Sequence, residues 1–160
     1  MAREIDTFEF HPNETARVVA AMEQLSAAHD GWINLLPGVD EDEDRSGGQP
    51  GALGGLFGPP QTPVAMCTWF PRKKGRPAGE STIGIMHPRS RHAIAQLADL
   101  GAPLPTGWRV RQDHARRGLI VLAPPSVTNR SVLEWSLAAG ALLSMVPLTG
   151  MWEARVYQPV

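Results

Sequence analysis

The chain has 160 residues, 42 % of them apolar, and this length favours a single domain with a packed core. Its one cysteine, Cys67, excludes an intramolecular disulfide, and the sequence contains no 18-residue apolar stretch and no signal-peptide pattern. We therefore expect a soluble, cytoplasmic protein without a membrane span. Residues 1–160 are predicted to form one domain with a mobile insertion at about 40–62.

Charge is distributed unevenly along the chain. Residues 1–62 carry three arginines against eleven carboxylates, a net charge of −8, whereas residues 63–160 carry twelve basic residues against five acids, a net charge of +7. Such asymmetry indicates either an anionic partner for the second part or neutralisation of the second part by the first. Neutralisation within the chain is the simpler interpretation.

The first predicted elements are a strand over residues 4–10 and a helix between Asn13 and Gly31. The helix follows from apolar residues at helical spacing, with Asn13 as its N-cap and Gly31 as its stop. Residues 31–39 are apolar and end in Pro-Gly, which favours a short strand or an extended segment. The apolar residues of the helix are Val18, Met22 and Leu25.

Residues 40–63 begin with five consecutive acids and continue with many glycines and prolines, which predicts a mobile insertion or a functional flap. The alternating aspartates 40, 42 and 44 resemble the start of a calcium-binding EF-hand loop. That loop is excluded, because Arg45 stands where glycine is required and Gly51 where a glutamate is required. No lysine followed by Ser or Thr completes a phosphate-binding loop in the glycine-rich part.

The second half alternates strands and helices. Residues 63–70 are apolar on both faces, which predicts a central strand, and residues 81–87 form the next strand. A helix starts near residues 88–90 and ends at Gly101. Strands at 107–113 and 118–124, a helix at 131–145 capped by Ser131 or by Thr128 or Asn129, and a strand at 150–157 complete the chain.

This order predicts an α+β fold, with a mostly antiparallel sheet built from two successive hairpins and about three helices packed on it as a two-layer sandwich. The strand at 118–124 is continuously apolar, which is typical of a strand covered on both faces. Trp108 and Trp152 alternate with polar residues and are predicted to lie in the core.

The segment QDHARRGL, residues 112–119, resembles either a catalytic loop or a hairpin turn. In a strand, Arg109, Arg111 and Asp113 share one face. Asp113 and His114 are adjacent, so they point to opposite faces and cannot form a catalytic dyad with each other. This favours the hairpin turn, with Gly118 supplying a positive φ.

Other kinds of site find little support. One cysteine and five histidines show no spacing typical of zinc ligands, so no metal and no cofactor are expected. Cys67 lies in an apolar strand, which indicates a buried, inert thiol. Nucleic acid is not favoured as a partner, because no RNA- or DNA-binding signature is present and the pI is near 6.5.

Basic residues are the strongest candidates for binding. They lie on the hairpin face, at its tip, at the expected start of the second helix, and in the basic loop 72–76. The predicted ligand-binding residues are Arg109, Arg111, Arg116, Arg117, Arg89 and Arg91. The first hypothesis is a non-catalytic domain that binds a protein partner or a small anionic ligand, with the acidic insertion regulating access.

Two alternatives belong to different classes. A small enzyme could act on a phosphorylated or carboxylated substrate, with His114 or His87 as general acid or base. The chain could instead be a subunit of a larger assembly, such as a homo-oligomer, in which the charge asymmetry forms head-to-tail contacts.

Overall fold

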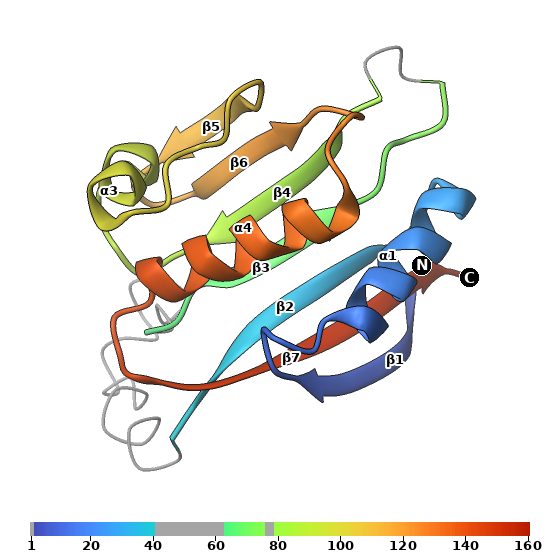
Figure 1. Ribbon diagram of the computed structural model, residues 1–160, viewed down its shortest axis with the longest axis horizontal. Helices are drawn as coiled ribbons and strands as arrows, with labels where there is room; N and C mark the ends of the chain where they lie inside the picture. Colours follow the sequence, from blue (N-terminus) through green and yellow to red (C-terminus); the bar gives the residue numbers. More distant parts are fainter. Residues whose placement is uncertain (1, 41–62, 76–78) are drawn as a thin grey trace, which may run out of the picture.

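The computed structural model describes residues 2–40, 63–75 and 79–160. These residues form an α+β fold with an antiparallel sheet, as the sequence predicts (Figure 1). The elements are, in chain order, β1 (Ala2–Phe10), α1 (Ala16–Ala28), β2 (Trp32–Val39), β3 (Met66–Phe70), β4 (Ser81–Met86), α3 (Ala93–Leu100), β5 (Arg109–His114), β6 (Gly118–Ala123), α4 (Asn129–Leu143) and β7 (Leu148–Pro159).

The seven strands lie in the order β1-β7-β2-β3-β4-β6-β5. The prediction that residues 63–70 form a central strand is confirmed, because β3 is the fourth of the seven. β1 and β5 are the two edges. β7 lies between β1 and β2 and pairs antiparallel with both, so the last strand joins the beginning of the chain and the two termini lie side by side (Figure 1).

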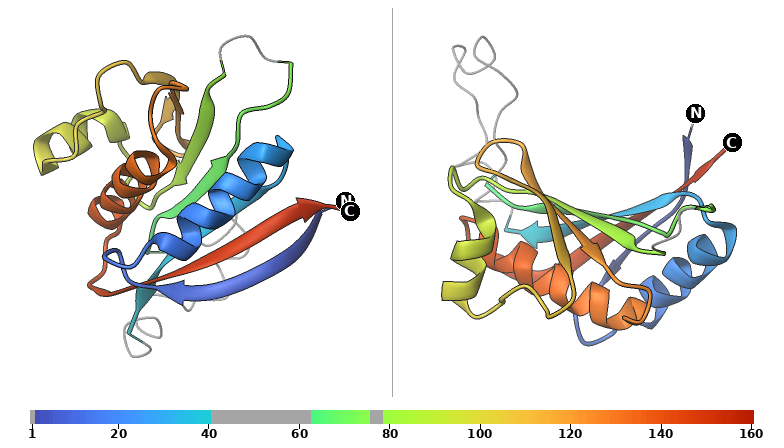
Figure 2. Two further views of the ribbon diagram at one scale, coloured as in Figure 1. Left: turned by 45° about the vertical axis from the view of Figure 1, so that its right-hand side comes forward. Right: turned by 90° about the horizontal axis from the view of Figure 1, so that it is seen from above.

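The three helices of the described residues lie on one face of the sheet (Figure 2). On that side the strands bury alternate residues, such as Cys67 and Trp69 on β3. α4 approaches the centre of the sheet so closely that the Cys67 thiol donates a hydrogen bond to the carbonyl of Ser136. Burial raises the pKa of this thiol to about 12, so the predicted buried, inert cysteine is confirmed. Trp108 and Trp152 are also buried, as expected.

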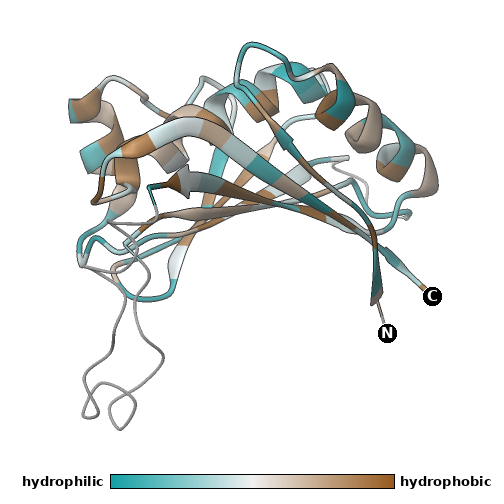
Figure 3. Cartoon of the chain, turned by 90° about the horizontal axis from the view of Figure 1, so that it is seen from below, coloured by the Kyte–Doolittle hydropathy of each residue, from teal (hydrophilic) through white to brown (hydrophobic). Residues whose placement is uncertain are grey.

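The face turned away from the helices is called here the open face (Figure 3). The prediction that residues 118–124 are covered on both faces is wrong. Leu119 and Val121 are buried against the helices, whereas Ile120 and Leu122 remain half-buried on the open face. No described helix covers the second face of β6, so a second helix layer among the described residues does not explain why this strand is continuously apolar.

The predicted starts of the first two helices are corrected. The N-cap of α1 is Thr15 instead of Asn13, whose N–H bonds the Nδ1 of His11. His29, at φ 55°, ends α1 two residues before Gly31. Residues 88–90 precede α3, which begins only at Ala93.

The N-terminus of α4 matches one of the predicted alternatives. The hydroxyl oxygen of Thr128 accepts a 3.1 Å hydrogen bond from the N–H of Ser131, so Thr128 is the N-cap. The acidic and glycine-rich residues 41–62 and Arg76 lie outside the described residues, and the mobile insertion stays a prediction. Within the described residues, no helix is both long and apolar enough to cross a membrane.

Candidate functional site

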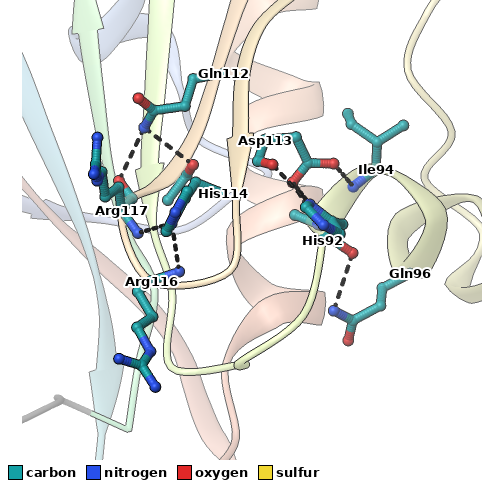
Figure 4. Close-up of polar contacts among 10 residues, drawn as sticks. His92, Ile94, Gln96, Gln112, Asp113, His114, Arg116 and Arg117 are labelled. Carbon is teal, nitrogen blue, oxygen red and sulfur yellow. Dashed lines mark hydrogen bonds and ion pairs between the residues drawn. The ribbon is translucent and has the colours of Figure 1, made fainter.

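The carboxylate of Asp113 caps the N-terminus of a helix from a neighbouring strand. Its two oxygens accept hydrogen bonds from the backbone N–H groups of Ala93, at 2.7 Å, and Ile94, at 3.1 Å (Figure 4). The Nδ1 of His92 lies 2.7 Å from the carbonyl oxygen of Asp113. Asp113 thus satisfies two N–H groups that every helix start leaves unpaired.

The adjacent His114 closes the turn between β5 and β6. Its Nδ1 accepts hydrogen bonds from the backbone N–H groups of Arg116 and Arg117, both at 3.1 Å (Figure 4). The strand β6 then starts at Gly118, at φ 88°, where a Cβ would lie 2.6 Å from the carbonyl oxygen of Ile85. The carboxylate of Asp113 and the Nδ1 of His114, which made QDHARRGL resemble a catalytic loop, thus both accept backbone hydrogen bonds within the fold.

A β-bulge decides where these side chains point. The register of β5 against β6 shifts between Val110 and Gln112, and Asp113 pairs with Leu119, whose side chain is buried on the helix side. The expectation that Asp113 shares a face with Arg109 and Arg111 is therefore wrong. One extra residue in β5 reverses the alternation beyond it.

A pocket of about 240 Å³ opens on the open face across β3, β4, β6 and β5. We call it the anion pocket. Phe70, Ile120 and Pro71 provide its apolar part, and Thr82 adds a hydroxyl group. Its lining residues are Phe70, Pro71, Lys73, Glu80, Thr82, Arg111 and Ile120.

The charges around the anion pocket do not cancel. Glu80, whose side chain is only 12 % exposed, accepts hydrogen bonds from Nε of Arg109, at 3.0 Å, and from its terminal NH2 group. These bonds hold the pKa of Glu80 below its ordinary value, so this carboxylate is charged and is neutralised by Arg109. Lys73 and Arg111 form no ion pair with any described residue, which leaves two positive charges in the pocket.

The structure brings only some of the predicted ligand-binding residues together. Arg111 lines the pocket, and Arg109 adjoins it through Glu80. Arg116 and Arg117 lie at the tip of the hairpin, outside the pocket lining. The other two lie before α3: Arg89 donates a 3.1 Å hydrogen bond to the carbonyl of Leu142 near the end of α4, and Arg91 is exposed.

Neither candidate acid–base histidine lines the pocket. His87 is half-buried, and both of its ring nitrogens are buried without a hydrogen-bond partner among the described residues. This burial lowers the pKa of His87, although the nearby carboxylate of Asp113 acts in the opposite direction. The described residues contain no group of three or more side chains that could hold a metal ion.

Sequence reasoning missed most of the pocket. Phe70, Thr82 and Ile120 look like ordinary strand residues, and only the tertiary structure shows that they share a face without helices. The sequence contains one indication that Glu80 pairs with a basic residue, because it is a lone acid shortly after the basic loop 72–76. Its ion pair with Arg109 joins the start of β4 to β5, and no local sequence spacing predicts a contact between residues so far apart in the chain.

Comparison with known proteins gives no family for this chain. No known protein family matches it, and neither a curated protein nor a solved structure is significantly similar to it. A function is therefore inferred from its own geometry alone.

Proposed function

We propose that this protein is a non-catalytic binding module for a small organic anion, a phosphate or carboxylate attached to an apolar body. The observation that carries the proposal is the presence in one pocket of two cations that form no ion pair with a described residue, Lys73 and Arg111, beside the apolar side chains of Phe70 and Ile120. A guanidinium fork matches phosphate and carboxylate geometry, and an apolar wall suits the rest of the ligand.

The size of the pocket restricts the ligand. A volume of about 240 Å³ is below the roughly 300 Å³ at which sites for drug-sized molecules begin, so the ligand is a small metabolite. In this proposal the fold is a two-layer sandwich built from two hairpins, and the anion binds on the sheet face that no described helix covers. The catalytic alternative is less well supported, because its proposed acid–base residues, His114 and His87, lie outside the pocket lining, and Glu80, which lines the pocket, is paired with Arg109.

The test is isothermal titration calorimetry with phenyl phosphate, with inorganic phosphate and with uncharged benzyl alcohol. Phenyl phosphate should bind more tightly than either fragment, because only it uses both the cations and the apolar wall. Arg111→Gln should weaken its binding by about tenfold or more, since a charge-assisted hydrogen bond contributes about 1.5–3 kcal/mol. Lys73→Gln should act in the same direction.

The matched control is Arg116→Gln, which removes an arginine from the same hairpin outside the pocket. Its affinity for phenyl phosphate should equal that of the wild type. Equal losses in Arg111→Gln and Arg116→Gln would mean that net charge alone attracts the anion. Absence of binding by phenyl phosphate at millimolar concentration would contradict the proposal.

A further inference from the structure

The open face, which no described helix covers, carries several large apolar side chains, most of them half-buried. In an antiparallel sheet with one solvated face, that face normally carries polar side chains. Here the ring of Trp32 stacks on Tyr157 at a centroid distance of 5.2 Å and contacts Phe70 at 6.3 Å, which forms a continuous aromatic band. Apolar surface of this kind marks a site of interaction. On β2, β3, β4 and β6 its large apolar residues are Trp32, Leu36, Met66, Phe70, Met86, Ile120 and Leu122.

A glycine lies near the middle of this face. Gly84, on β4, pairs with Thr68 on one side and Ile120 on the other. Its φ is not in the left-handed region, and a Cβ there would meet nothing closer than the carbonyl oxygen of Thr68 at 4.0 Å. Neither the backbone nor packing within the chain requires glycine. A glycine inside a strand often marks a place where another surface approaches closely.

The open face is also polarised in charge. At the end of the sheet formed by β1 and β7, the open face carries three carboxylates and one guanidinium, a net charge of −2. At the other end, around β5, three cations stand against one carboxylate, a net charge of +2. The acidic end comprises Glu4, Glu9, Glu153 and Arg155, and the basic end Lys73, Arg109, Arg111 and Glu80.

The acidic end is hollowed. A cavity of about 400 Å³ lies where β1, β7 and β2 meet, and Glu9 and Glu153 contribute to its lining. These two carboxylates are directly opposite each other across β1 and β7. Like charges in that position repel, and only Glu153 has an ion pair with a described residue, Arg155. Glu9 is exposed and forms no ion pair with a described residue.

We propose that the open face binds the open face of a second copy of this chain, about a two-fold axis that passes near Thr68. Thr68 lies at the middle of β3, the central strand of the seven. Rotation about that axis places β1 of one copy over β5 of the other, so the acidic end of each copy meets the basic end of its partner. The pairing register puts Glu9 level with His114 and not with Arg109, so Arg111 is the arginine of the basic end that Glu9 of the other copy can reach.

A second copy of the chain fits this face because the open face is self-complementary in charge and in apolar surface. The two ends have equal and opposite charge, the apolar band lies between them, and a two-fold interface joins the same patch on both subunits. Two sheets that pack face to face lie about 10 Å apart with strands within about 30° of each other, which this axis permits. The absence of a side chain at Gly84 lets the two backbones approach beside the axis.

The inference does not depend on the proposed anion function, because the anion pocket is formed within one chain. A bound anion and the Glu9 carboxylate of the second copy would compete for Arg111, which lines the anion pocket.

The first test is the mass of the protein in solution, measured by light scattering at about 100 μM chain, roughly a hundredfold above a micromolar Kd. The wild type should have a mass of about 35 kDa, twice the 17.3 kDa of the chain. Gly84→Arg should be monomeric, because the new side chain fills the approach. Its thermal unfolding should remain cooperative, because open space surrounds that position.

The matched control is Leu100→Arg, which places the same side chain on α3, at an apolar residue that is 44 % exposed in the helix layer. This variant should remain a dimer. A dimer in Gly84→Arg, or a monomer in both variants, would overturn the proposed face.

The second test exchanges the charges. Glu9→Arg alone and Arg111→Glu alone should each raise the dissociation constant of the dimer by about tenfold or more, since each creates two repelling pairs across the axis. The double variant should restore the dimer, because two-fold symmetry keeps both pairs complementary. Failure of the double variant to restore it would overturn this arrangement. A monomeric wild type would overturn the dimer and leave phenyl phosphate binding as the separate test of the pocket.

Discussion

The carboxylate of Asp113, on the edge strand β5, accepts a 2.7 Å hydrogen bond from the backbone N–H of Ala93, the first residue of α3. A residue twenty positions later in the chain therefore supplies the cap that the helix does not carry itself, since His92, at the N-cap position, makes no side-chain cap bond. The bond joins the helix layer to the sheet.

Removing the Asp113 carboxylate should destabilise the protein. Asp113→Ala leaves two helix N–H groups without acceptors, and loss of such a cap lowers the free energy of unfolding by about 1–2 kcal/mol. Asp113→Asn keeps one acceptor oxygen and should show a smaller loss. Urea denaturation measures both changes. Asp99→Ala, which removes an exposed carboxylate from the other end of α3, is the control and should stay within about 0.5 kcal/mol of the wild type.

Filling the gap at Gly84 should stabilise the isolated chain. Gly84→Ala adds a methyl group that meets only open space, and glycine within a strand costs about 0.5–1 kcal/mol relative to alanine. The free energy of unfolding should therefore rise by about that amount at low chain concentration, where association contributes nothing. Gly118→Ala should do the reverse, since its φ is 88° and the Cβ would lie 2.6 Å from the carbonyl oxygen of Ile85. Equal effects of the two substitutions would contradict this account.

Acidification should destabilise the fold through His87. Its burial lowers the folded-state pKa below the ordinary value of 6.5. As the pH falls through 6.5, the unfolded chain binds a proton at His87 before the folded chain does, so the free energy of unfolding decreases. The decrease ends once the pH is below the folded-state pKa. At pH values above 6.5 the histidine is neutral in both states and has no such effect.

The measurement is chemical denaturation of the wild type and His87→Gln between about pH 7.5 and pH 5, the range around an unperturbed histidine. The variant should lose less stability over this range than the wild type. The difference between their free energies of unfolding at pH 7.5 reports the change in packing alone. Parallel curves over the whole range would contradict the assignment to His87.

Much of the fold could be predicted from local patterns. The alternation of residues 150–157 placed Trp152 in the core, and the apolar faces of residues 63–70 placed β3 at the centre of the sheet. Thr128 could be foreseen as one of the possible caps of α4. These features depend on residues within a few positions of one another, and the periods of helices and strands express them directly.

The candidate site could be predicted only in part. Arg111, which was predicted to bind a ligand, lines a pocket that it shares with Lys73 and Glu80 from the connection before β4. Asp113 was placed on the wrong face, because a single bulge residue reverses the alternation of β5 and no local signal marks the bulge. Arg109 was predicted to bind a ligand, whereas in the structure its charge is neutralised by an ion pair with Glu80.

The sequence by itself determined the element order, the core face of strands such as β3 and β7 and the polarity of charge along the chain, because each depends on residue type and spacing. The tertiary structure decided that all three described helices cover one face, that β7 pairs with β1, and that Lys73, Arg111 and Phe70 line one pocket. Such contacts join residues far apart in the chain. Their energies depend on distances that exist only after the chain has folded.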